Sequence, residues 1–124
     1  MNNKRPVNLD LTKFSFPLPA LTSIVHRVTG VMLFVGMVFL LYALDLSLSG
    51  EEGFNAVKEC MESFIAKFII WGVVSALLFH MVAGTKHLLM DVGIGETLEG
   101  GVLGAKLTIA ISLVLIVMAG IWLW

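Results

Sequence analysis

Residues 64–90 read FIAKFIIWGVVSALLFHMVAGTKHLLM, an apolar stretch long enough to cross a lipid bilayer as one α-helix. About 20 residues at a rise of 1.5 Å span the ~30 Å hydrocarbon core, so this stretch has length to spare. Two histidines, His80 and His87, stand among its apolar side chains. An ionisable side chain in hydrocarbon costs several kcal/mol unless it is paired, and it therefore indicates a functional site.

The two histidines share one helical face with a glycine and an aspartate. Their spacing follows the i, i+4, i+7, i+11 pattern, which places His80, Gly84, His87 and Asp91 on one stripe. A neutral imidazole is a common iron ligand, and a glycine one turn away leaves room for a flat macrocycle. The only cysteine, Cys60, excludes a C-x-x-C-H attachment, so the pattern predicts non-covalent haem.

The two histidines cannot serve one iron together. His80 is expected near mid-membrane and His87 near the end of the span, about 10.5 Å further along the helix axis. A six-coordinate iron bound by His80 therefore needs its second ligand from another subunit, and two stacked haems with one histidine each are the alternative. For each histidine taken alone, a hydrogen bond between helices is the competing interpretation.

The rest of the chain is typical of a small all-α membrane protein. Of its 124 residues, 58% are hydrophobic and 14% are charged, which is far from the composition of a soluble domain. Two further apolar stretches, Leu21–Leu48 and Lys106–Trp124, are long enough to span, so we expect three transmembrane helices in residues 21–124. Residues 1–20, which include three prolines, are expected to form an N-terminal segment at the membrane surface. The first span is too long for a signal peptide and should stay in the mature protein.

The connections and the polar faces of the spans predict a partner. Glycines and acidic residues mark residues 49–63 and 91–105 as loops. Three helices bury little surface among themselves, and the polar stripes of the first two spans would face lipid in a monomer. We therefore expect the chain to pack with a second anchor subunit into a helical bundle.

The distribution of charge predicts the orientation in a membrane. Lys4, Arg5 and Lys13 precede the first span, whereas residues 49–63 carry four glutamates against one lysine. By the positive-inside rule, the N-terminus and residues 91–105 face the cytoplasm and the C-terminus faces the periplasm. The formal net charge of −1 gives no electrostatic case for nucleic acid.

The first span carries three polar residues near its start. Ser23 and Arg27 form an i, i+4 pair on one face, and both can donate a hydrogen bond to a quinone carbonyl. Arg27, or a protonated His26, can neutralise a haem propionate. Anchoring at the lipid headgroups is the alternative interpretation of these side chains.

With these residues in view, the chain resembles the cytochrome b membrane-anchor subunit of bacterial succinate dehydrogenase (respiratory complex II) over essentially its full length. Two blocks carry the resemblance: RPVNLDL at residues 5–11 with SIVHRVTG at residues 23–30, and HMVAGTKHLLMDVG at residues 80–93. One position departs from the family pattern, because Lys86 stands where arginine is usual. Lysine keeps the positive charge but lacks the bidentate fork of a guanidinium.

The resemblance implies a cofactor and roles for particular residues. In that family the residue matching His80 is an axial ligand of haem b, and the companion anchor subunit supplies the second ligand. Residues matching Ser23 and Arg27 contribute to the ubiquinone site, and those matching His26 and Arg27 are associated with the haem propionates. Gly84 and His87 complete the cofactor site that we expect.

The resemblance also implies partners and a location. It implies a complex in the bacterial inner membrane with a flavoprotein that oxidises succinate, an iron–sulfur protein and two anchors, of which this chain is one. The chain itself would have no dehydrogenase chemistry and would pass electrons to ubiquinone in the respiratory chain. Two alternatives are the anchor of a quinol:fumarate reductase and a small proton-relay or transport subunit without haem.

Overall fold

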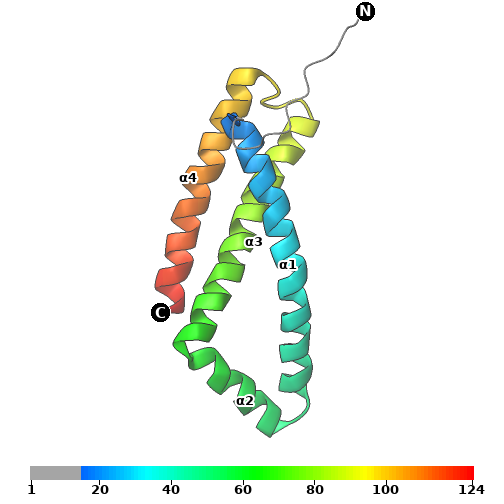
Figure 1. The fold of residues 1–124 in the computed structure, drawn as a ribbon, viewed down its shortest axis with the longest axis vertical. Helices are drawn as coiled ribbons and strands as arrows, with labels where there is room; N and C mark the ends of the chain where they lie inside the picture. The colour runs from blue at the N-terminus through cyan, green and yellow to red at the C-terminus, as the bar shows by residue number, and fades with distance from the viewer. Residues whose placement is uncertain (1–14) are drawn as a thin grey trace, which may run out of the picture.

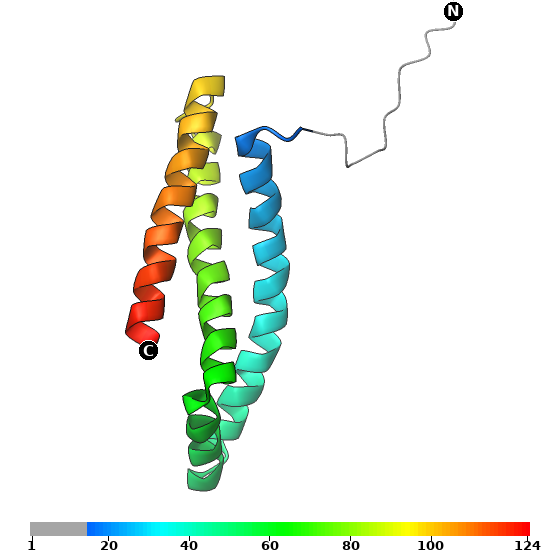
Figure 2. The same cartoon turned by 60° about the vertical axis from the view of Figure 1, so that its left-hand side comes forward.

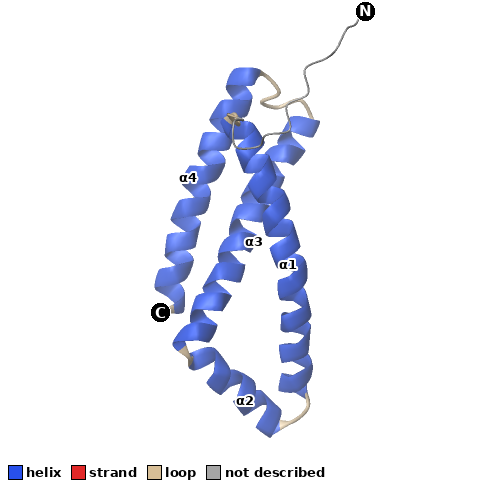
Figure 3. Ribbon diagram, in the orientation of Figure 1, coloured by secondary structure: helices blue, strands red, loops and turns tan. Residues whose placement is uncertain are grey.

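The structure, a computed structural model, describes residues 15–124, and within that range it contains four helices and no strand (Figure 3). Helix α1 is Leu18–Leu48, α2 is Glu51–Glu62, α3 is Phe64–Asp91 and α4 is Leu98–Leu123. Three of these helices, α1, α3 and α4, are long and apolar enough to cross a membrane. The prediction of an all-α protein with three membrane-spanning helices is therefore confirmed.

Helix α3 lies between α1 and α4 (Figure 2). Helices α1 and α3 approach each other in the half of the molecule that also holds the α3–α4 loop, and they diverge toward α2, which joins them at the opposite end (Figure 1). The C-terminus lies toward the α2 end of the molecule. The N-terminus of α1 and the α3–α4 loop therefore lie on one side of the bundle, as the predicted topology requires.

Local sequence signals explain where the helices begin. Pro17 occupies the N-cap position of α1 and Pro19 lies in its first turn, where prolines are favoured because the N–H they lack would have no intrahelical partner. Ser63 caps α3 by accepting from the Ala66 backbone N–H, and Thr97 caps α4 by accepting from that of Gly100. Between α3 and α4, Gly93 and Gly95 have φ values of 91° and 73°, a region that side chains disfavour.

The two predicted loops are more helical than expected. Residues 51–62 form α2, whereas their glycine and glutamates had indicated a loop. The helix is amphipathic, with Phe54 and Met61 on its apolar side. Helix α4 begins at Leu98 and not near Lys106. The glycines at 100, 101 and 104, which had indicated a loop, lie within this helix. Gly101 is buried and approaches Pro19 of α1, so these glycines serve close helix packing.

The core consists of small side chains. The buried positions between the spans are Thr22, Thr29, Ala76, Ala83, Gly101, Ala105, Thr108 and Ser112. Membrane helices associate through such residues because lipid offers no hydrophobic driving force against large apolar groups. The large apolar side chains of the spans are correspondingly exposed outward, where lipid or a partner subunit would cover them.

Candidate functional site

A cluster of three imidazoles occupies the contact between α1 and α3. We call His26, His80 and His87 the histidine cluster. The rings of His26 and His80 are stacked, with centroids 4.1 Å apart and planes inclined by 16°. The ring of His87 lies 5.3 Å from that of His26 and is tilted by 57°. The polar faces of the first two spans therefore meet here, and the expectation that they face lipid is wrong for the histidines.

One nitrogen of His80 is engaged and the other is free. His80 Nδ1 lies 3.1 Å from the backbone oxygen of His26 and 3.1 Å from Thr29 Oγ1. A carbonyl oxygen can only accept, so Nδ1 carries the proton and Nε2 carries the lone pair. Within residues 15–124, Nε2 has no hydrogen-bond partner. The imidazole thus presents one available ligand atom, in the arrangement that metal-binding histidines favour.

Two glycines make room for the stacked rings. A Cβ at Gly30 would lie 3.2 Å from His80 Cε1, and one at Gly84 would lie 3.4 Å from His26 Nε2. Gly84 was predicted to leave room for a flat macrocycle. The space beside it exists, but in this structure the ring of His26 lies there. Gly30 is the tighter of the two positions, because a Cβ contact at 3.2 Å forces the neighbouring atom to move.

Ser23 and Arg27 lie on a neighbouring face of α1. At about 100° per residue, Arg27 is turned about 100° from His26, and Ser23 lies between them. Arg27 is exposed and Ser23 is half-buried. Among the described residues, neither side chain has a hydrogen-bond or ionic partner. Two donors without partners, one turn apart, are thus available to an acceptor from outside the chain.

The histidine cluster cannot enclose a metal ion on its own. No group of three or more potential ligands in residues 15–124 converges on one point. Stacked rings also leave no space between them for an iron and a macrocycle. Of the three rings, only that of His80 has one nitrogen held by hydrogen bonds while the other has no partner among residues 15–124.

Two other polar positions lie apart from the histidine cluster. Asp91 is exposed at the end of α3. Lys86 points to the other side of α3, where its stem packs 3.3 Å from the position of a Cβ at Gly104. It lines a cavity of about 480 Å³ between α3 and α4 whose other lining residues include Met90 and Leu103.

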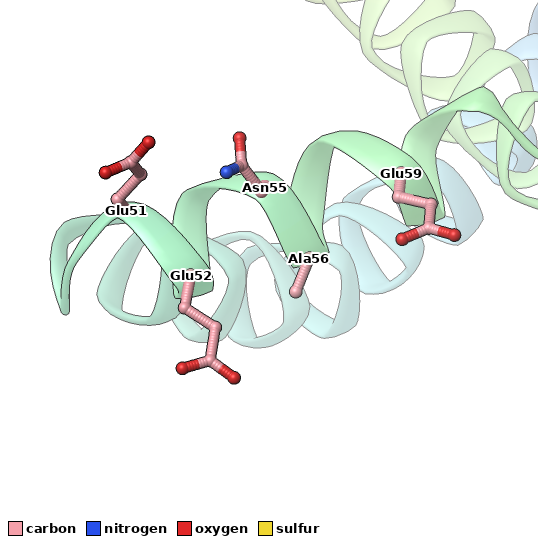
Figure 4. Close-up of a pocket in the computed structure, with 5 residues that line it drawn as sticks. All are labelled: Glu51, Glu52, Asn55, Ala56 and Glu59. Atoms are coloured by element: carbon pink, nitrogen blue, oxygen red, sulfur yellow. The ribbon is translucent and has the colours of Figure 1, made fainter.

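A second depression lies on α2. Its lining residues are Glu51, Glu52, Asn55, Ala56 and Glu59. The carboxylates of Glu51 and Glu52 point in opposite directions and do not converge on a common ligand (Figure 4). Neither this depression nor the α3–α4 cavity is lined by Ser23, Arg27 or a histidine.

Comparison with known proteins decides the family. The sequence model of the family "Succinate dehydrogenase/Fumarate reductase transmembrane subunit" matches residues 1–119. The chain is 42% identical to the succinate dehydrogenase cytochrome b556 subunit of Coxiella burnetii, with 100% of both chains covered. The chain belongs to this family. It is a succinate dehydrogenase cytochrome b membrane subunit.

More distant relatives agree. The cytochrome b556 subunit of Paracoccus denitrificans is 32% identical over 92% of this chain and 88% of its own length. The mitochondrial cytochrome b560 subunit of Sus scrofa is 32% identical over 95% of this chain and 73% of its own length. The cytochrome b subunit described here is thus a multi-pass membrane component of an oxidoreductase complex, and the resemblance noted in the sequence is confirmed.

Sequence reasoning about this cytochrome b subunit missed two features of the site. It expected the first span to begin at Leu21 and placed His26 at a haem propionate, with headgroup anchoring as the alternative, whereas α1 begins at Leu18 and the ring of His26 stacks on that of His80. It also assigned no role to Thr29. A signal was present, because Thr22, His26 and Thr29 recur at the spacing of one helix face.

Proposed function

We propose that this chain binds haem b through His80 Nε2 and forms part of a quinone-reduction site in a succinate dehydrogenase complex. The observation that carries the proposal is the hydrogen bonding of the His80 ring. Its Nδ1 is committed to two oxygens of α1, which leaves Nε2 as a lone-pair donor inside a membrane bundle.

The other residues of the site fit the edges of such a cofactor. Arg27 would neutralise a propionate, with His26 beside it, since both lie on adjacent faces of α1. His87 and Gly84 would line the site, His87 through its ring and Gly84 by accommodating His26. A companion anchor subunit would supply a second ligand to the iron. When bound, the haem supplies a one-electron redox centre within the membrane.

Ser23 and Arg27 are proposed to bind ubiquinone. A quinone is reduced by two electrons and two protons, and negative charge develops on its carbonyl oxygens. The Ser23 hydroxyl and the Arg27 guanidinium can both donate to one such oxygen, and a charged donor strengthens that hydrogen bond about twofold. Neither donor has a partner among residues 15–124, so binding a quinone would not break an existing interaction.

The complex would lie in the bacterial inner membrane with the N-terminus in the cytoplasm. Ser23 and Arg27 would then lie near the cytoplasmic face, where an iron–sulfur subunit reduced by the flavoprotein would deliver electrons. Lipid and the companion anchor would cover the exposed apolar side chains of the spans. The chain would contribute no succinate-oxidising residue of its own.

The absorption spectrum of the purified complex tests this proposal. We expect the sharp α-band of a reduced b-type, low-spin haem, in a ratio of one haem per copy of this chain. A succinate-reducible complex without haem would contradict the proposal and favour the proton-relay alternative, which the histidine cluster alone would serve.

A further inference from the structure

The hydroxyl of Thr29 sits between the two histidines that the site depends on. Thr29 Oγ1 lies 2.7 Å from the backbone oxygen of His26, one turn earlier in α1, and 3.1 Å from Nδ1 of His80 on α3. The Thr29 side chain is only 6% exposed. Its hydroxyl therefore links the backbone of α1 to the imidazole of α3 in a buried position.

The direction of each hydrogen bond in this link follows from the chemistry of the atoms. The His26 carbonyl can only accept, so the Thr29 hydroxyl uses its single proton there. The lone pairs of Oγ1 are then the groups that face His80 Nδ1. They accept from Nδ1–H, and the same N–H also donates to the His26 oxygen. Both acceptors hold the proton of His80 on Nδ1.

We propose that Thr29 is the positioning residue for His80: it fixes the tautomer and the orientation of the ring and strengthens electron donation from Nε2. This inference rests on the proposed binding of haem iron by Nε2. An imidazole whose N–H donates to an oxygen is a more basic ligand, and a more basic ligand stabilises the oxidised metal. Thr29 thereby lowers the midpoint potential of the haem.

The comparison with other buried threonines shows that this link is specific to Thr29. Thr22 is 3% exposed and Thr108 is 2% exposed, and each donates to a carbonyl of its own helix. Neither has a second partner on a neighbouring helix within residues 15–124. Thr22 lies on the same face of α1, two turns before Thr29, and so provides a control with similar burial and the same kind of backbone hydrogen bond.

Gly30 supports the same link from the adjacent position. The space of its missing Cβ lies 3.2 Å from His80 Cε1 and 3.8 Å from His80 Nδ1. The acceptor at residue 29 thus holds the ring, and the missing side chain at residue 30 leaves the space that the ring occupies. Because both features belong to one segment of α1, the orientation of the His80 ring depends on how closely α1 and α3 pack.

The test compares Thr29→Ala, Thr29→Ser and Thr22→Ala in the complete complex. Alanine and serine both remove the methyl group, and they differ only in the hydroxyl. Haem content, the low-spin electron paramagnetic resonance signal and the midpoint potential are measured for each. In Thr29→Ala we expect a midpoint potential shifted to more positive values and haem affinity about tenfold lower. Thr29→Ser and Thr22→Ala should match the unmodified complex.

Two results would overturn the inference. If Thr29→Ala and Thr29→Ser have the same midpoint potential, the hydroxyl does not act on His80, and equal shifts in Thr22→Ala would indicate a general packing effect. If the complex with Thr29→Ala does not assemble, Thr29→Val takes the place of Thr29→Ala in the comparison, because valine keeps the side-chain volume of threonine and lacks the hydroxyl. Failure of the proposed haem binding is seen separately, as retention of low-spin haem after His80→Leu.

Discussion

The imidazoles of His26 and His80 stack face to face across the α1–α3 contact, with centroids 4.1 Å apart. Rings in this arrangement cannot bind opposite sides of one iron, because their ring nitrogens do not point at each other across a gap. The pair instead acts as a unit in which the backbone of His26 accepts from His80 and its ring covers one face of His80. His26 thus supports the ring of His80, the residue that is proposed to bind the iron.

Replacing Gly30 should disturb the site more than replacing other glycines of the spans. In Gly30→Ala the new Cβ would lie 3.2 Å from His80 Cε1, so the ring must move, and we expect lower haem content and an altered low-spin signal. At Gly72 a Cβ would meet nothing within 4 Å, so Gly72→Ala is the matched control and should leave both unchanged. Equal effects of the two variants would mean that the close approach at Gly30 is unimportant.

Ser23→Ala should impair quinone reduction selectively. The hydroxyl is proposed to donate to a quinone carbonyl, and loss of one such hydrogen bond costs on the order of 1 kcal/mol, or about fivefold in turnover. Succinate oxidation with an artificial acceptor should be nearly intact because that reaction precedes the membrane site. Ser47→Ala, which removes an exposed hydroxyl bonded to the Leu44 carbonyl, is the control. Equal losses in both assays of Ser23→Ala would indicate an assembly defect and refute the role.

The sequence predicts the three membrane spans of the fold, but it does not predict helix α2 or the stacking of two histidines. The length and hydropathy of the spans predict the three membrane helices, because hydrocarbon permits few alternatives. Helix α2 was missed because glutamates and a glycine are common to loops and to exposed amphipathic helices. The stacking of His26 on His80 was missed because it depends on where α1 begins and on the register of α1 against α3, which periodicity within one helix does not define.

Trp71 should stabilise the end of the bundle that is remote from the histidines. Its Nε1–H donates to the Ile116 carbonyl of α4 over 2.9 Å, and its ring packs against Trp124. We expect Trp71→Phe to lower the free energy of unfolding by about 1 kcal/mol, visible as a lower melting temperature of the detergent-solubilised complex. The haem spectrum should not change. Trp122→Phe alters an exposed ring and serves as the control, and an equal loss of stability there would contradict this assignment.

The orientation in the membrane can be tested at the single thiol. Cys60 is exposed on α2, at the end of the bundle opposite the α3–α4 loop. With the N-terminus in the cytoplasm, a membrane-impermeant maleimide should label Cys60 in intact cells whose outer membrane has been permeabilised, and Cys60→Ala should abolish the label. Labelling that occurs only in inverted vesicles would reverse the topology and move Ser23 and Arg27 to the wrong side for the proposed electron entry.

The central claim is that His80, and not its neighbour His87, binds the haem iron. The most direct test is the reduced spectrum of the assembled complex after each histidine is replaced by leucine. We predict that His80→Leu loses low-spin bis-histidine haem, whereas His87→Leu retains it, because only His80 presents a free Nε2 with its Nδ1 held by α1. Retention of that signal in His80→Leu, together with its loss in His87→Leu, would contradict the claim.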